Sequence, residues 1–192
     1  MLCLSAAMIS KGLAQPERKS AMIILITGAS HTGKTALAQR LMEKRGWPYL
    51  SLDHLKMGLI RSGYTSLTVE EDDALTAFMW PIVREMIKTA IENDQHMIIE
   101  GCYLPFDWQK DFDRDYLPSI RFICLVMTED YIRGHFGDIR AYGSVVENRG
   151  DDPGLDLEAL VQDNAAMMAQ CRSNGFEPLV ISGEYCVPLP EC

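Results

Sequence analysis

The sequence predicts an α/β protein with a central parallel sheet that is covered by helices on both faces. Short apolar runs without polar alternation recur along the chain, as expected of strands that are buried on both sides. Segments with helical periodicity lie between these runs, and this alternation is typical of a parallel sheet with right-handed crossovers. With 192 residues, the chain is long enough for one domain with a substantial core.

The first predicted strand, in the apolar run 22–27, leads into a glycine loop. The sequence of this loop, GASHTGKT, matches the phosphate-binding P-loop pattern at every fixed position. Glycines let the backbone approach a phosphate, Lys34 can reach the β- and γ-phosphates, and Thr35 can place its hydroxyl on Mg²⁺. We predict Lys34 to be catalytic and the whole loop to bind a nucleotide: Gly28, Ala29, Ser30, His31, Thr32, Gly33, Lys34 and Thr35.

A helix over residues 34–45 should follow the loop and end at Gly46. A second strand, residues 49–52, then leads to Asp53, with a short helix over residues 54–60. Asp53 is thus expected at the carboxyl end of a strand, where open α/β sheets bind ligands. Its carboxylate can accept a hydroxyl proton or hold Mg²⁺ through water, and a helix N-cap is the alternative role.

A long helix is expected from Thr68 to about Asn93. Thr68 and Glu71 form the capping-box pattern that opens such a helix. Pro81 lies inside it, and because proline removes a backbone donor and clashes with the preceding turn, a kink or break is expected just before it.

A third strand, residues 96–101, carries an acid at its end. P-loop proteins usually keep there the acid that binds Mg²⁺ directly or through water. We therefore predict Glu100 to be a metal ligand or a residue of the substrate pocket. The alternative is a carboxylate that accepts hydrogen bonds from loop amides at the strand end.

A fourth strand, residues 120–126, is followed by Thr128, which should cap a helix. Four glycines between Arg133 and Pro153 argue against one uninterrupted helix and favour a mobile flap. We predict this flap, about residues 133–153, to be a lid. A last helix over residues 155–174 and a fifth strand over residues 178–181 complete the predicted fold.

Several cations are candidates for the chemistry. Arg133 and Arg140 are seven residues apart, so on a continuous helix they would share a face and could stabilise a transferring phosphoryl group. Arg149 follows in the flap, although each arginine taken alone is as easily an ordinary surface residue. For an anionic acceptor, the candidate clamps are Lys56, Arg61 and Arg84, beside Asp53 and Glu100 in the substrate site.

Composition limits the partners. A net charge of −9 makes broad binding to nucleic acid unattractive, because that affinity comes from clustered Lys and Arg. No segment reaches the roughly 18 apolar residues expected of a membrane span. Six cysteines without a CxxC pair suggest neither zinc nor a disulfide framework, so a reducing cytoplasm is expected.

Residues 1–20 read as an extension ahead of a domain spanning residues 21–192, and we reject a signal peptide because no basic segment precedes the short apolar run there.

The P-loop, the acid after strand two and the arginine-bearing segment after strand four together resemble the P-loop kinase group. This group includes adenylate kinase, shikimate kinase, gluconate kinase and chloramphenicol phosphotransferase. The segment 97–104 is also similar to the third strand of 2-phosphoglycerate kinase-like proteins. The resemblance implies a three-layer P-loop NTPase fold with five strands in the order 2-3-1-4-5, ATP with Mg²⁺, and a closing lid.

Two residues depart from the pattern of this group. Lys56 stands where relatives that bind a nucleoside monophosphate commonly have arginine, and lysine lacks the bidentate fork. Glu100 replaces the more common aspartate. The resemblance therefore does not name the substrate.

The resulting functional hypothesis is a small-molecule kinase with Asp53 as the base. A nucleotide-binding or slowly ATP-hydrolysing switch that acts through a protein partner is the alternative, and the absence of an Asn-Lys-x-Asp run disfavours a GTPase. Polynucleotide kinase activity is a third possibility, which the net negative charge of the chain disfavours. The sequence predicts no oligomeric state.

Overall fold

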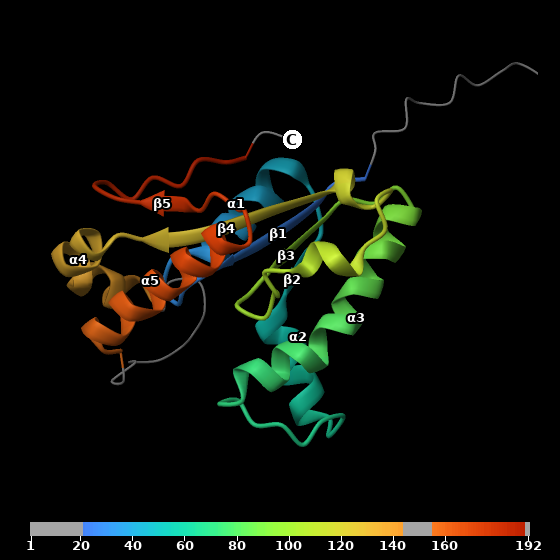
Figure 1. Cartoon of the computed structure of the whole chain (residues 1–192), viewed down its shortest axis with the longest axis horizontal. Coiled ribbons are helices and arrows are strands. Elements are labelled where there is room, and N and C mark those ends of the chain that lie inside the picture. The colour runs from blue at the N-terminus through green and yellow to red at the C-terminus, as the bar shows by residue number, and fades with distance from the viewer. Residues whose placement is uncertain (1–20, 144–154, 191–192) are drawn as a thin grey trace, which may run out of the picture.

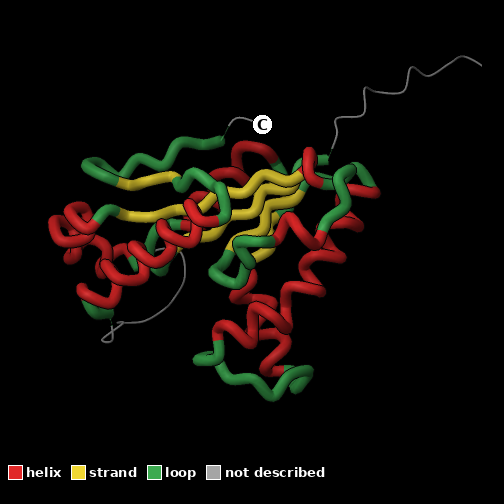
Figure 2. The backbone as a smooth tube through the Cα atoms, viewed as in Figure 1, coloured by secondary structure: helices red, strands yellow, loops and turns green. Residues whose placement is uncertain are grey.

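One parallel sheet organises the chain. A computed structural model describes residues 21–143 and 155–190, and its strands lie in the order β2-β3-β1-β4-β5, at the centre of Figures 1 and 2. Every pairing between neighbouring strands is parallel. The predicted three-layer P-loop NTPase fold and its strand order are confirmed. The strands are β1 (Ile23–Gly28), β2 (Tyr49–Ser51), β3 (Met97–Glu100), β4 (Ile120–Met127) and β5 (Leu179–Ile181).

Helices flank this sheet. In the described parts of the chain they are α1 (Lys34–Arg45), α2 (Leu52–Arg61), α3 (Asp72–Glu92), α4 (Glu129–Tyr142) and α5 (Leu157–Ser173), with the short 3₁₀ helices η1 (Trp108–Asp111) and η2 (Leu117–Ser119). Figure 1 shows α2 and α3 side by side, and α4 and α5 together near the carboxyl end of β4. Within residues 21–143 and 155–190, we find no helix with the length and apolar character that crossing a membrane requires.

Strand β1 is the centre of the core because both of its faces are buried. Ile23 and Leu25 pack in a cluster with α3 and the segment 103–112. Ile24 and Ile26 face the opposite side, where they pack with side chains of α1 and α4. All four side chains are fully buried, which explains why this run lacks polar alternation in the sequence.

Helix α1 has the bounds that the sequence predicts. Its N-cap, Gly33, has φ 83°, and its C-cap, Gly46, has φ 68°. The N–H of Gly46 donates to the carbonyl of Met42 at 2.8 Å, as in other left-handed C-caps. Both ends of the helix therefore use a backbone conformation that glycine adopts without steric cost.

Helix α3 differs from the prediction at two points. It begins at Asp72 rather than Thr68, because the Glu71 carboxylate accepts the N–H and the hydroxyl of Thr68 in a turn that precedes the helix. It also runs through Pro81 without a break. Pro81 and Ala77, whose carbonyl loses its donor, are both at least partly open to solvent, so water can satisfy that carbonyl.

Helix α4 corrects the prediction that a flap begins at Arg133. The helix continues through Gly134 and Gly137 to Tyr142. Only His135 within it has non-helical angles, φ −124° and ψ 19°. The interruption predicted from the glycines is therefore a local kink.

Two further predictions concern the segments beside this helix and at the start of the chain. Thr128 caps α4 as predicted, and its hydroxyl accepts the N–H of Tyr131 at 3.2 Å. The rest of the predicted lid, residues 144–153 with Arg149, lies outside the described residues. The predicted extension, residues 1–20, lies outside them as well.

Candidate active site

The P-loop connects β1 to α1 as predicted, and its geometry directs a lysine inward. Gly28 has φ 145°, and a Cβ there would lie 2.2 Å from the carbonyl oxygen of Leu125, so β1 and β4 approach closely where the loop begins. The Lys34 ammonium donates to the carbonyl of Ala29 at 2.8 Å, and the Thr32 hydroxyl donates to the same oxygen at 2.8 Å. Lys34 is only 8% exposed, so its charge is held within the loop.

Thr35 and Glu100 meet beside this loop. The Thr35 hydroxyl, in the first turn of α1, donates to Oε2 of Glu100 at 3.3 Å. Glu100 is the last residue of β3 and is 1% exposed. The hydroxyl of Tyr49 donates to the other carboxylate oxygen, Oε1, at 2.9 Å. The structure thus brings together the two predicted metal ligands and adds Tyr49, which the sequence showed only as a strand residue.

The oxygens of Thr35 and Glu100 fit Mg²⁺. Mg²⁺ prefers hard oxygen ligands and usually keeps several waters while bound to one or two carboxylates and substrate phosphates. The described residues contain no cluster of three or more His, Cys, Asp or Glu side chains that could hold a metal. A Mg²⁺ bound by Thr35 and Glu100 would take further ligands from substrate phosphates and water. Ser51, the partner of Glu100 in the β2–β3 register, has a buried hydroxyl with no hydrogen-bond partner among the described residues.

A cavity of about 690 Å³ lies next to the P-loop on the α4 side; we call it the α4-side cavity. Its aromatic side chains include Tyr131 and His135, whose rings stack with centroids 4.3 Å apart. A cavity of this size with aromatic and apolar walls suits a drug-sized ligand such as a nucleoside. It is lined by His31, Gly33, Lys34, Thr35, Ala36, Met127, Tyr131, His135, Asp138, Ile139, Tyr142, Gly143, Glu184 and Tyr185.

The segment after β5 forms part of this cavity, although no sequence pattern predicted a role for it. The Tyr185 hydroxyl donates to the carbonyl of Thr32 at 3.3 Å. Burial raises the pKa of Tyr185 above its ordinary value, so the phenol remains a donor at neutral pH. Arg40 of α1 holds the same segment by donating to the carbonyl of Val187 at 3.0 Å.

Asp53 lies in the first turn of α2, one residue beyond the start of that helix. Strand β2 therefore ends at Ser51, one residue earlier than predicted. Ser51 rather than Asp53 is the N-cap of α2. The Lys56 ammonium lies 3.1 Å from Oδ1 of Asp53, and their side chains are 13% and 32% exposed. Asp53 thus remains accessible to a ligand while a cation fixes its position.

Lys56 is also bound to Tyr103, which sequence analysis did not identify. Its ammonium donates to the Tyr103 hydroxyl at 2.6 Å, and that hydroxyl donates to Oδ1 of Asp72 at 3.1 Å. Burial opposes the charge of Lys56, but its hydrogen bonds to Tyr103 and Asp53 prevail and raise its pKa above the ordinary value. Burial raises the pKa of Tyr103 to about 12. Lys56 is therefore charged, and its charge is already shared between two partners.

A second cavity, of about 530 Å³, lies on the α3 side of the loop; we call it the α3-side cavity. Cys102 connects it to the P-loop, because the thiol lies 3.9 Å from the carbonyl oxygen of Gly28. Tyr103 and Asp72 connect it to Lys56 and Asp53. Its lining residues are Asp72, Asp73, Thr76, Cys102, Tyr103, Leu104, Pro105, Phe106, Asp107, Met167, Gln170 and Asn174.

The two predicted catalytic arginines do not line the α4-side cavity. Arg133 forms a bidentate ion pair with Glu158 of α5, at 2.6 and 2.9 Å, and donates to Glu129 at 2.8 Å. Arg140 is exposed. The kink at His135 lies between them, so the regular helix on which they would share a face is interrupted there.

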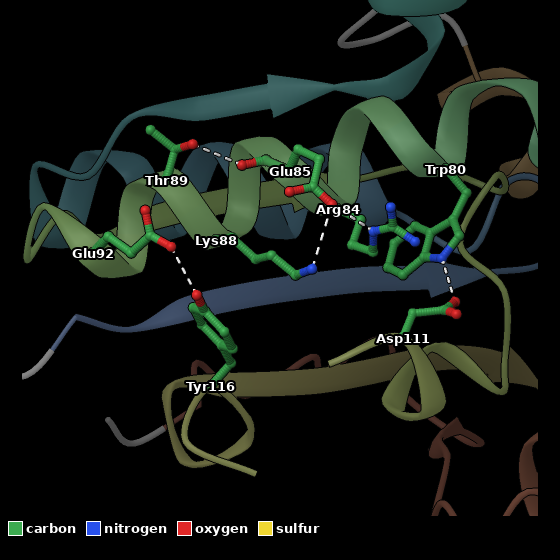
Figure 3. A network of polar contacts seen from close by, with 8 residues as sticks. All are labelled: Trp80, Arg84, Glu85, Lys88, Thr89, Glu92, Asp111 and Tyr116. Atoms are coloured by element: carbon green, nitrogen blue, oxygen red, sulfur yellow. Dashed lines mark hydrogen bonds and ion pairs between the residues drawn. The ribbon is translucent and has the colours of Figure 1, made fainter. Parts of the chain in front are cut away.

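Two of the three predicted acceptor clamps also lie away from the cavities. Arg84 hydrogen-bonds the neighbouring Glu85 at 2.8 Å on α3, as Figure 3 shows. Arg61 is exposed in the last turn of α2. Of the predicted clamps, only Lys56 contacts a residue of the α3-side cavity.

The comparisons with known proteins identify kinases among solved structures. No protein-family model matches the chain, and no curated protein matches its sequence. It is similar to deoxyadenosine kinase from M. mycoides, with 15% identity and a TM-score of 0.47 over 84% of this chain and 90% of that chain. It is similar to shikimate kinase from Bacteroides thetaiotaomicron, with 12% identity and a TM-score of 0.45 over 79% of each chain. It is also similar to a gluconokinase from Sinorhizobium meliloti 1021, with 18% identity and a TM-score of 0.39 over 81% of this chain and 95% of that chain.

Proposed function

We propose that this protein is an ATP-dependent phosphotransferase that moves the γ-phosphate of ATP to a small-molecule acceptor. The main support is that one cavity is lined by the P-loop and a second cavity is joined to the loop through Cys102. Lys34 and Thr35 line the α4-side cavity, while Cys102 of the α3-side cavity contacts Gly28. A donor and an acceptor can therefore approach the same loop from two sides. A nucleotide-dependent switch would need only the first of these cavities.

The burial of the two acids supports different roles for them. Glu100 is almost fully buried against Thr35 and Tyr49, which suits a ligand of the metal. Asp53 is about one-third exposed and paired with Lys56, which suits a base that must reach an acceptor. We therefore assign the metal to Thr35 and Glu100, and proton acceptance to Asp53.

Each group then has a defined task in phosphoryl transfer. The loop amides and Lys34 bind the β- and γ-phosphates. Mg²⁺ held by Thr35 and Glu100 would supply positive charge to the phosphate oxygens. As the acceptor oxygen bonds to the γ-phosphorus, its proton passes to the Asp53 carboxylate. The bond from the γ-phosphorus to the bridging oxygen breaks, and ADP leaves.

The proposed setting is the cytoplasm, where ATP is available, with a small molecule as the acceptor. The net charge of −9 favours such an acceptor over a nucleic acid.

A thermal-shift panel can identify the acceptor. The full chain is mixed with Mg²⁺, a non-hydrolysable ATP analogue and candidate sugars, glycerates, nucleosides or aminoglycoside-like alcohols. A ligand at about 100 times its Kd stabilises the folded state by about 2.7 kcal/mol, so the correct acceptor should raise Tm above the value with the analogue alone. The same compound should then stimulate ADP release from ATP.

Three variants test the proposed roles in that assay. Lys34→Ala should abolish acceptor-stimulated ADP release, and Asp53→Ala should lower kcat by about 10²- to 10⁴-fold, the usual contribution of a general base. His54→Ala is the matched control, since His54 is the exposed neighbour of Asp53 on α2. Full activity of Asp53→Ala would refute its assignment as the base. Tight nucleotide binding with no stimulation by any acceptor would favour a switch.

A further inference from the structure

We propose that Tyr49 is a positioning residue for the Mg²⁺ site, an inference that rests on the proposed nucleotide site. Its hydroxyl donates to Oε1 of Glu100 at 2.9 Å, while the Thr35 hydroxyl donates to Oε2 at 3.3 Å. The two oxygens of one carboxylate thus have different partners. Tyr49 holds the first oxygen, and the second is left facing the hydroxyl that would share the metal.

The Glu100 carboxylate needs such a partner. The terminal torsion of a glutamate has a broad distribution, so packing alone does not fix the direction of its oxygens. Glu100 is 1% exposed, and a buried charge is costly unless it is hydrogen-bonded. A charge-assisted hydrogen bond from a phenol supplies both the compensation and the orientation.

The sheet places Tyr49 in reach of this carboxylate. In the β2–β3 register Ser51 pairs with Glu100, and Tyr49 pairs with Ile98. Tyr49 and Ser51 are two residues apart on one strand and therefore lie on the same face as Glu100. The Tyr49 ring packs against the core cluster that contains α1. This packing fixes the ring, so the hydroxyl has a constant position relative to Glu100.

A packing role and a positioning role make different predictions for Tyr49→Phe. Phenylalanine keeps the ring and its contacts with the core but removes the hydroxyl. If Tyr49 only fills space, metal affinity should not change. If it positions Glu100, metal affinity should fall while binding of the nucleotide without metal stays the same.

The experiment measures Mn²⁺ binding to the full chain with a non-hydrolysable ATP analogue, using the electron paramagnetic resonance signal of free Mn²⁺. Residues that orient metal ligands typically contribute 10- to 100-fold to metal affinity. We expect Tyr49→Phe to weaken Mn²⁺ binding by about 10-fold or more. Affinity for the analogue in EDTA should stay within about 2-fold of the unmodified protein, less than 0.5 kcal/mol by the usual conversion.

Tyr116→Phe is the matched control. The Tyr116 hydroxyl also donates to a glutamate, Oε1 of Glu92, at 2.7 Å, but that pair joins α3 to the loop before β4, as Figure 3 shows. Its removal tests the general effect of losing a Tyr–Glu hydrogen bond. Tyr116→Phe should leave both Mn²⁺ and analogue affinities unchanged.

Two results would overturn the proposal. One is unchanged Mn²⁺ affinity in Tyr49→Phe, and the other is an equal loss of affinity for the analogue with and without metal. If Tyr49→Phe does not fold, ¹⁹F spectra of the wild-type chain labelled with 3-fluorotyrosine replace it. Mg²⁺ added to the analogue complex should shift the signal of residue 49 but not that of residue 116, and an unshifted residue 49 contradicts the proposal. Because no step requires turnover, failure of phosphoryl transfer would leave these results interpretable.

Discussion

At the scale of single residues, Gly33 joins the P-loop to the segment after β5. Its φ is 83°, and a Cβ there would lie 1.8 Å from the Tyr185 hydroxyl oxygen. A side chain at this position would therefore meet both backbone strain and a direct clash. The clash involves the tyrosine that lines the α4-side cavity, so it should affect the ligand site as well as stability.

An alanine in a left-handed conformation is by itself expected to cost about 1–2 kcal/mol. We predict that Gly33→Ala lowers the free energy of unfolding by more than this. Gly46→Ala is the control, because Gly46 has φ 68° and a Cβ added there would have no neighbouring atom within 4 Å. Urea unfolding of both variants separates strain from clash. Adding Tyr185→Phe to Gly33→Ala should recover part of the extra loss, and equal effects of the two glycine variants would contradict the predicted clash.

At the scale of elements, α3 carries a proline that the helix accommodates at the cost of one hydrogen bond. We predict that Pro81→Ala stabilises the protein, since alanine restores an N–H donor to the carbonyl of Ala77. Proline is about 3 kcal/mol less favourable than alanine inside a helix, and its rigidity in the unfolded chain offsets up to about 1 kcal/mol. A net gain of about 2–3 kcal/mol in urea unfolding is expected. Pro118→Ala, at the start of η2, should give no gain, and a loss in Pro81→Ala would contradict the prediction.

The ion pair of Arg133 and Glu158 links α4 to α5 and gives a pH-dependent prediction. Hydrogen bonds from Arg133 lower the pKa of Glu158 below its ordinary value of 4.5. A lowered folded-state pKa means that the stabilisation is present above pH 4.5 and is lost as the pH falls through the folded-state pKa. Arg133→Leu should therefore lower Tm slightly at pH 7, and this effect should shrink as the pH is lowered below 4.5.

The effect of Arg133→Leu should be small and should shrink at high salt, because both side chains are exposed. The same variant should keep acceptor-stimulated ADP release, since Arg133 is bound to glutamates on the α4–α5 surface. A loss of turnover without a change in Tm would instead support the catalytic role that the sequence suggested.

At the scale of the whole molecule, the sequence was most informative where a pattern is local. The P-loop glycines, the buried runs of β1 and β4 and the Gly46 end of α1 each depend on neighbouring residues, and the structure confirms them. Of the kink or break expected at Pro81, the break is absent from α3, and the flap expected from Arg133 is helical as far as Tyr142, with a kink at His135. At both places the packing of the helix against the rest of the protein outweighs the local preference for an interruption.

The sequence predicted only part of the site, because the other residues of the site come together only in the folded chain. Thr35 and Glu100 are 65 residues apart but each belongs to a recognisable local pattern, so their pairing was foreseeable. Tyr103 lies 47 residues from Lys56, and Tyr185 lies 153 residues from Thr32. Neither tyrosine carries a local signal, and only the strand order and the tail geometry bring them to the loop.

The central claim is that the chain transfers a phosphoryl group rather than only binding or hydrolysing ATP. The direct measurement is a single turnover of ATP labelled at the γ-phosphate, with Mg²⁺ and each compound of the acceptor panel in turn. We predict that one acceptor receives the label, at a rate that falls by about 10²-fold or more in Asp53→Ala and that vanishes in Lys34→Ala. Label that appears only as inorganic phosphate, or that stays in ATP, with every acceptor would contradict the claim.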